Sequence, residues 1–129
     1  DQVLSVFTDN YVNVNSPIEL IDYHFVRNPD IKVTLTLKLD GEVRDITAGG
    51  NGRLDAVSNA IKKHLGISYS DLTYEEHALS TGSSSSAVTY VSITFPDGKK
   101  SWGAGINDDI IASSINALFS AINRGISKN

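Results

Sequence analysis

The clearest pattern in the chain is a strict alternation of apolar and polar positions across residues 31–39. The apolar positions are Ile31, Val33, Leu35, Leu37 and Leu39. This period of two predicts a strand with one buried face and one partly wet face of lysines and threonines. Asp40-Gly41 is typical of a tight hairpin turn, so residues 43–48 are predicted to be the returning strand.

Two later segments instead repeat their apolar residues at helical spacing. In the first, the stripe is Leu54, Val57, Ile61 and Leu65, and Gly66 follows as a stop. In the second, the stripe predicts a helix from about residue 107 to residue 124. A third helical stripe near the start of the chain consists of Val3, Phe7, Tyr11 and Val14.

Three further strands are predicted at residues 74–81, 87–95 and 99–104, with a turn at Pro96-Asp97-Gly98. The serines of residues 83–86 predict a flexible hairpin loop. Residues 18–26 leave two alternatives open. Ser16-Pro17 followed by Glu19 resembles a helical capping box, whereas the alternation that follows favours a strand.

The chain contains a repeat at a fixed offset of 57 residues. Asp40-Gly41 corresponds to Asp97-Gly98, and Asn59-Ala60 corresponds to Asn116-Ala117. Each half reads as a hairpin, a glycine-rich turn and a helix, the second turn being Gly103-Ala104-Gly105. Two such units predict an α+β fold whose antiparallel sheet is covered by helices on one face. The other face is then left for solvent, a partner domain or a second copy.

Composition narrows the classes of function. The net charge is −4 with scattered basic residues, which argues against nucleic acid. No apolar run approaches the roughly 18 residues that span a bilayer, and no signal peptide is evident, so no membrane partner is expected. The absence of cysteine excludes disulfides and thiolate metal sites and fits a cytoplasmic protein. The chain begins at Asp1 rather than Met, which predicts a piece of a longer protein.

The candidate binding feature is the segment Gly49-Gly50-Asn51-Gly52, which precedes a predicted helix. Backbone N–H groups at a helix start, together with the helix dipole, favour an anion such as a phosphate or carboxylate. The simpler alternative is a tight turn whose glycines only permit positive φ. Asp55, in the first helical turn, either stabilises the dipole or holds the cation of a ligand. An anion site beside a carboxylate is what a zwitterion needs.

No other pattern predicts chemistry. His77 in Tyr74-Glu75-Glu76-His77 lacks companions at metal-ligand spacing, so no metal site and no cofactor are expected. The serine run lacks the elbow sequence of a serine nucleophile, and no catalytic residue is predicted. Trp102 is expected to lie in the core.

The segments "GGNGRLDA", "YEEHALSTGSSSSAVTYV" and "GAGINDDIIASSINALFSAINR" resemble the C-terminal regulatory domain of 2-isopropylmalate synthases. The resemblance covers nearly the whole chain. It implies residues 1–15 as the remnant of a linker helix and residues 16–129 as the regulatory domain, with repeat halves at about 18–66 and 73–126. It also favours the strand alternative for residues 18–26.

What the resemblance implies is a pseudo-two-fold repeat of a βββα unit that forms a homodimer and binds L-leucine for feedback inhibition. The parent enzyme would condense acetyl-CoA with 3-methyl-2-oxobutanoate, using a divalent metal in a catalytic domain of the same chain outside these residues. A cytoplasmic location follows, or an organelle if a transit peptide precedes the chain.

The resemblance also implies the effector-binding residues. The polar end of leucine would meet the glycine turn, and its side chain would enter an apolar pocket. The implied residues are Gly50, Gly52, Leu54, Asp55, Tyr74, Ala78, Ser85, Ala87 and Ile106. Two departures from the family pattern stand out: Arg53 replaces a frequent proline, and serines 83–86 replace alanine and acidic residues.

Three rival functions remain open at this point. A related domain in citramalate synthases senses isoleucine. A dimerisation module without ligand binding would fit Arg53 and the serine run. An enzyme in its own right is disfavoured by the missing catalytic constellation.

Overall fold

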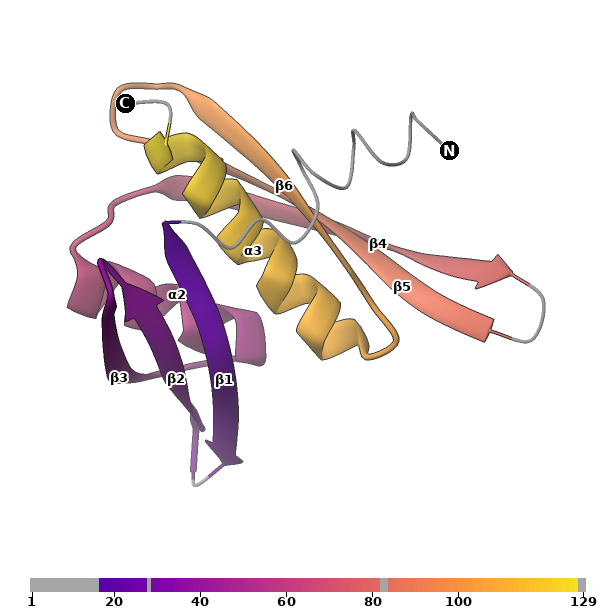
Figure 1. Cartoon of the computed structure of the whole chain (residues 1–129), viewed down its shortest axis with the longest axis horizontal. Coiled ribbons are helices and arrows are strands. Elements are labelled where there is room, and N and C mark those ends of the chain that lie inside the picture. The colour runs from indigo at the N-terminus through magenta and orange to yellow at the C-terminus, as the bar shows by residue number, and fades with distance from the viewer. Residues whose placement is uncertain (1–16, 28, 82–83, 128–129) are drawn as a thin grey trace. The chain divides into compact units, whose positions relative to one another are not determined.

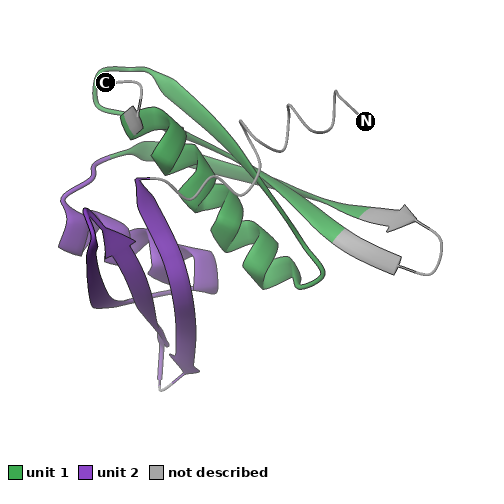
Figure 2. Cartoon of the chain, in the orientation of Figure 1, with its two compact units in different colours: residues 1–16, 69–129 green, residues 17–68 purple. Residues whose placement is uncertain are grey.

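The computed structural model describes residues 17–27, 29–81 and 84–127. These divide into two compact units, shown in Figure 2: unit 2 is Pro17–Ser68, and unit 1 contains the described part of Tyr69–Asn129. The predicted linker helix at residues 1–15 lies outside the described residues. Each unit is described by itself below.

Unit 2 is a three-stranded antiparallel sheet followed by one helix (Figure 1). Its elements are β1 (Ile18–Arg27), β2 (Ile31–Leu39), β3 (Glu42–Gly50) and α2 (Arg53–Leu65). Asp40 and Gly41 both have positive φ, 54° and 79°, as a two-residue type I′ hairpin requires. Gly66 ends α2 in the left-handed conformation, with φ 66°. The predicted strand, turn and helix are all confirmed.

The two alternatives for residues 18–26 are also resolved, because β1 is a strand. It pairs with β2 along its whole length, from Ile18 opposite Leu39 to Arg27 opposite Ile31. A bulge between Leu20 and Asp22 shifts the register once. A capping box at Ser16-Pro17 would have satisfied only a helix end, whereas pairing with β2 satisfies the backbone of the whole segment.

The core of unit 2 lies between its sheet and α2. The fully buried side chains are Ile18, Val33, Leu35, Ala56, Val57, Ala60 and Ile61. The opposite face of the sheet is polar, as predicted. There, Thr34 and Thr47 join their hydroxyls across 3.1 Å, and Thr36 donates to Asp45 at 2.8 Å.

Unit 1 repeats this order, and the two strands of its first hairpin are longer than those of unit 2. Its elements are β4 (Ser70–Thr81), β5 (Ser84–Thr94), β6 (Lys100–Asn107) and α3 (Ile110–Ser127). The turn after β5 closes with Gly98 N–H donating to Phe95 O at 2.9 Å, and Gly98 has φ 87°. The β4–β5 hairpin extends past the start of α3 (Figure 1).

Two predictions of secondary structure in unit 1 are wrong. Ser84–Ser86 were expected in a loop, but their backbones extend β5 by pairing with β4. Gly103-Ala104-Gly105 was expected to be a turn, but it lies inside β6. A Cβ on Gly105 would overlap Ser113 O and lie 2.7 Å from Ala117 N. These glycines therefore let α3 pack directly against the backbone of β6.

The predicted fold class is confirmed: an α+β repeat of two βββα units with antiparallel sheets. The described strands form two three-stranded sheets, one for each repeat, rather than one shared sheet. Each hairpin returns within its own unit and buries one face against its own helix. The offset of 57 also holds in the structure, since α2 begins after Gly52 and α3 begins after Asp109.

Among the described residues, neither helix has the length and hydropathy needed to cross a lipid bilayer.

Candidate functional site

The candidate site begins where β3 gives way to α2. Gly52 precedes the helix in an extended conformation (φ −145°, ψ 175°) and has no side chain that caps it. The first intrahelical bond runs from Ala56 N–H to Gly52 O at 2.9 Å. The amides of Arg53, Leu54 and Asp55 come before that bond, so the helix itself supplies them with no acceptor. The start of α2 therefore offers donors to an anion.

Gly50 is not required here for a positive φ angle. It is absent from the described glycines with positive φ, so the simple turn explanation is wrong for it. A Cβ at Gly50 would lie 2.6 Å from Asp55 Oδ2 and 2.7 Å from Ala56 N. The bare backbone of Gly50 is thus needed because the first turn of α2 packs against it.

Gly52 differs, because no atom lies within 4 Å of the place where its Cβ would be. The space beside the helix start is open at this position. Asp55 holds the turn from the other side, since its Oδ2 accepts the N–H of Asn51 at 2.9 Å. The carboxylate of Asp55 is exposed, so it both fixes the turn and remains within reach of a ligand.

Contacts between side chains and backbone tie the rest of α2 to β3 and β1. Asn59 donates to Gly49 O at 2.9 Å, and His64 Nε2 lies 2.8 Å from Thr47 O. Arg53, the first residue of α2, places its guanidinium carbon 6.0 Å from the ring centroid of Phe25. This is the outer limit of a cation–π contact. The helix start is therefore positioned by several contacts within unit 2.

Of the predicted residues in unit 1, three share one face of the sheet. Ala78 is paired with Ala87, and Tyr74 is paired with Val91. This face is the one that α3 covers, because Thr89, two positions from Ala87, joins its hydroxyl to that of Ser113 at 2.8 Å. Tyr74 is 55% exposed, whereas Ala87 is 9% exposed. The structure brings Tyr74, Ala78 and Ala87 together on one side.

Ile106 lies on the opposite face of the same sheet. It is paired with Val88, and side chains alternate between faces along each strand. Ser85 is paired with Ser80 near the end of the hairpin, and only its backbone is described. The predicted pocket residues of unit 1 therefore divide between two faces and the hairpin end.

Sequence reasoning missed a buried cluster of hydroxyl groups beneath α3. Thr89 and Ser113 are fully buried, and Ser114 is 9% exposed. The Ser114 hydroxyl lies 2.9 Å from Ile110 O and 3.4 Å from Glu76 Oε1. The signal was the pair Ser113-Ser114 inside an otherwise apolar helical pattern. Since the helix backbone accepts these hydroxyls, the cluster is explained by packing of α3 on the sheet.

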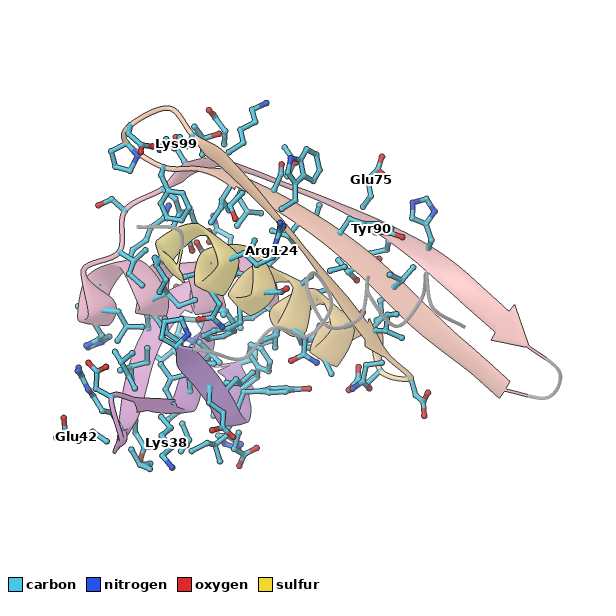
Figure 3. The ribbon with its side chains drawn as sticks, turned by 45° about the horizontal axis from the view of Figure 1, so that its top comes forward. Lys38, Glu42, Glu75, Tyr90, Lys99 and Arg124 are labelled. Atoms are coloured by element: carbon cyan, nitrogen blue, oxygen red, sulfur yellow. The ribbon has the colours of Figure 1, made fainter. Side chains whose placement is uncertain are left out.

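Trp102 and His77 both lie outside the core. Trp102 was expected in the core, but it is 54% exposed on the face of the sheet away from α3. His77 lies on the same face, 3.7 Å from Glu75 Oε2 and with its ring centroid 5.9 Å from that of Tyr90. In Figure 3, Glu75 and Tyr90 neighbour each other on the β4–β5 hairpin. Within the described residues, no three His, Asp or Glu side chains gather as metal ligands.

The comparisons with known proteins agree with one another. Residues 1–126 match a protein family described as "LeuA allosteric (dimerisation) domain". A 2-isopropylmalate synthase from Desulfitobacterium hafniense (strain Y51) is 48% identical over 123 residues, which are 95% of this chain and 22% of the relative. The 2-isopropylmalate synthase of Helicobacter hepaticus is 37% identical over 133 residues, which are 96% of this chain and 24% of the relative. One from Clostridium acetobutylicum is 38% identical over 133 residues, covering 96% of this chain and 23% of the relative.

The chain thus spans less than a quarter of the length of these relatives.

Proposed function

Because the chain belongs to the LeuA allosteric (dimerisation) domain family, we propose that it binds L-leucine as an allosteric effector. The parent protein would be a 2-isopropylmalate synthase, and bound leucine would inhibit it, so that the end product limits its own synthesis. The effector would bind at the interface of a homodimer formed by this domain. The protein would act in the cytoplasm.

The observation that carries this proposal is the uncapped start of α2. Three backbone amides precede the first intrahelical bond, and the space beside Gly52 is open. The positive end of the helix dipole lies at the same place, and Arg53 adds a full positive charge to the first turn. These features favour the α-carboxylate of an amino acid over a neutral ligand.

The remaining groups of leucine would be recognised separately. Asp55, or a nearby carbonyl, would accept the ammonium group, because this exposed carboxylate lies in the same turn. The isobutyl group would enter the apolar pocket predicted for unit 1, whose residues are Tyr74, Ala78, Ser85, Ala87 and Ile106. Burying a leucine side chain contributes roughly 1.5–3 kcal/mol, so the polar anchors must supply much of the affinity.

Ile106 lies apart from the other described members of this pocket. The geometry of unit 1 separates its side chain from those of Tyr74, Ala78 and Ala87 by the thickness of the sheet. A change of Ile106 to Ala that leaves leucine binding intact would remove it from the site while leaving the anchors at α2 in place.

The chemistry of the parent enzyme would reside elsewhere in the same chain. There, acetyl-CoA and 3-methyl-2-oxobutanoate would be condensed with the help of a divalent metal. The regulatory domain would contribute no catalytic group and would need no cofactor of its own. Its partners would be leucine, a second copy of the domain and the catalytic domain.

An isoleucine sensor of the citramalate synthase type is the second candidate. Both amino acids present the same carboxylate and ammonium groups, so the anchors at α2 suit either. The relatives named above are 2-isopropylmalate synthases, which favours leucine.

Thermal unfolding of this chain with L-leucine, L-isoleucine, L-valine or no ligand tests the proposal. A ligand at about 100 times its Kd adds roughly 2.7 kcal/mol to the stability of the folded state. This raises the Tm by several degrees in a chain of this size. Leucine should give the largest shift. A larger shift with isoleucine would replace leucine as the effector, and no shift with any of them would leave a dimerisation module.

The variant Gly52→Asp tests the position of the carboxylate. The new side chain has open space and a permitted backbone conformation, so the domain should fold normally. Its negative charge would occupy the amides at the helix start and repel the ligand, weakening leucine binding about 10- to 100-fold. Gly52→Ala is the matched control and should bind leucine within about threefold of the original. Titration calorimetry measures both, and unchanged affinity in Gly52→Asp would rule out this anchor.

A further inference from the structure

The turn between β3 and α2 contains Asn51-Gly52, the only position in the chain where a glycine follows an asparagine. Asparagine is among the chemically labile residues of proteins. Its side-chain amide is open to attack by the backbone nitrogen of the next residue, and glycine hinders that attack least because it has no Cβ. The pair therefore has the residue types that a spontaneous covalent change of the backbone requires.

The structure leaves this pair accessible. Asn51 is exposed and lies in the bend between the last residue of β3 and the first residue of α2. No atom lies within 4 Å of the place where a Cβ on Gly52 would be, so there is room for a new ring. Within the described ranges, neither the side-chain amide of Asn51 nor the N–H of Gly52 is hydrogen-bonded. Both reacting groups are thus free to meet.

The charges around the pair act in both directions. Attack requires the nitrogen of Gly52 to lose its proton, and negative charge develops on that nitrogen and then on the oxygen of Asn51. The positive end of the α2 dipole and the charge of Arg53 favour this change. Asp55 opposes it, because its carboxylate is nearby and its Oδ2 restrains the turn by accepting the Asn51 N–H at 2.9 Å. We therefore expect a slow reaction of the folded protein.

The other described asparagines lack this combination. Asn59 and Asn116 lie within α2 and α3, where the N–H of the following residue belongs to a helical hydrogen bond. Asn59 also donates its side-chain amide to Gly49 O at 2.9 Å. Asn107 accepts the N–H of the second residue after it at 2.9 Å, and Asn123 is fully buried. These four residues serve as internal controls.

We propose that Asn51 deamidates spontaneously through a succinimide formed with Gly52, and that the new negative charge weakens binding of the effector at the start of α2. The covalent step does not depend on any ligand. Its consequence for leucine rests on the proposed function, since the α-carboxylate of leucine would occupy the amides that follow Gly52.

The reaction needs only water as a second reactant. The deprotonated nitrogen of Gly52 forms a bond to Cγ of Asn51, and the bond from Cγ to Nδ2 breaks, so that ammonia leaves with the proton. Water then adds to one of the two carbonyl carbons of the ring, and the bond from that carbon to the Gly52 nitrogen breaks. Opening at Cγ gives aspartate, and opening at the main-chain carbon gives isoaspartate. Nothing is oxidised or reduced.

Both products place a carboxylate beside the helix start. It would compete with the carboxylate of leucine for the same amides and repel it, lowering leucine affinity about tenfold. Isoaspartate also lengthens the main chain between β3 and α2, which displaces the turn that Asp55 holds. Feedback inhibition of the parent enzyme would accordingly weaken as the protein ages.

Peptide mapping of the aged chain tests the covalent step. Trypsin releases residues 45–53, in which Asn51 is the only asparagine, and the adjoining residues 54–62, in which Asn59 is the only one. After incubation in ¹⁸O-labelled water, residues 45–53 should exchange an amino group for a labelled hydroxyl, and faster at higher pH. Residues 54–62 should remain unchanged.

Two variants connect the covalent step to leucine. Asn51→Gln keeps an amide but requires a larger ring, so its aged sample should keep the leucine affinity of its own fresh sample. Asn51→Asp carries the charge from the start and should bind leucine about tenfold more weakly than the fresh original chain, as the aged original should. Titration calorimetry measures all of these. Saturating leucine should also slow the conversion of residues 45–53, because it would hold the turn.

The outcomes separate this proposal from the proposed function. If residues 45–53 stay unmodified while the aged chain keeps its fold, deamidation is refuted, even where leucine still raises the Tm. If they convert and leucine affinity does not fall, the stated consequence is refuted. If they convert in a chain that never binds leucine, the deamidation stands, and the leucine sensor and the effect on it are both refuted.

Discussion

The two helices of this chain begin in contrasting ways, although they occupy equivalent positions of a duplicated unit. Before α3, Asp109 caps the helix by accepting the N–H of Ile111 at 2.9 Å, and Asn107 in turn accepts the N–H of Asp109 at 2.9 Å. Before α2, the equivalent of Asp109 is Gly52, which has no side chain.

The difference shows how one of the two repeat units keeps its helix start available to bind an anion. The Asp109 carboxylate at the N-cap already satisfies the Ile111 amide and interacts favourably with the dipole at the start of α3, so an external anion gains less there. A glycine N-cap leaves the amides of α2 to solvent or to a ligand. Of the two equivalent helix starts, that of α3 is therefore capped by its own side chain, whereas that of α2 has no side-chain cap and can accept an anion.

The largest expected effect comes from the packing behind these helix starts. Gly105→Ala would drive a Cβ into Ser113 O, a backbone atom that cannot move alone, and should lower the free energy of unfolding by at least about 2 kcal/mol. In Gly52→Ala the new Cβ has no atom within 4 Å, so the free energy of unfolding should change by only a few tenths of a kcal/mol. Chemical denaturation of both variants measures the contrast. Equal effects would mean that α3 does not press on β6 as described.

A smaller effect is expected from exchanging the caps. Asp109→Ala removes the acceptor of the Ile111 amide and should cost about 1 kcal/mol. Gly52→Asp supplies such an acceptor to α2 and should stabilise the domain by a few tenths of a kcal/mol. The two midpoints of urea denaturation should therefore move in opposite directions. A stabilising Asp109→Ala would contradict the assignment of Asp109 as a cap.

An effect on stability smaller than that of Asp109→Ala is expected at Asp55. Asp55→Asn keeps an oxygen for the Asn51 amide but loses the charge that favours the first helical turn, which costs about 0.5 kcal/mol. If Asp55 receives the ammonium of leucine, the same variant should lose about tenfold in leucine affinity. Calorimetry separates the two effects, and an affinity that is unchanged would assign Asp55 to the turn alone.

The sequence was sufficient for most of the fold because its local signals agree. One βββα unit is indicated by the alternation in β2, the Asp40-Gly41 turn and the helical stripe of α2. The offset of 57 residues predicts a second such unit in the other half of the chain. Residues 18–26 could not be decided locally. Their strand character depends on pairing with β2, which is a contact with a second segment of the chain and is not visible in the pattern of residues 18–26 alone.

The errors in unit 1 also have a physical origin. A glycine serves a turn, a positive φ or a close approach of two backbones, and only the third applies to Gly103 and Gly105. That contact lies in the tertiary structure. The exposure of Trp102 was missed for a related reason, because an apolar side chain on a strand indicates one buried face without indicating which one.

The candidate site was predictable only in part. The glycine pattern before a helical stripe indicated the start of α2, and the structure places open space and unclaimed amides there. The separation of Ile106 from Tyr74 depends on the register of three strands, in which a shift of one residue exchanges the two faces. Sequence spacing alone cannot fix that register.

One further contact bears on how the molecule avoids unwanted association. Arg124 (labelled in Figure 3), near the end of α3, donates from its guanidinium to the main-chain carbonyl of Trp102 in β6, which is an outer strand of its sheet. An exposed strand edge is a template on which another chain can grow a continuous sheet. Because Arg124 occupies a main-chain acceptor of this outer strand, we expect the contact to oppose the addition of another strand beside β6.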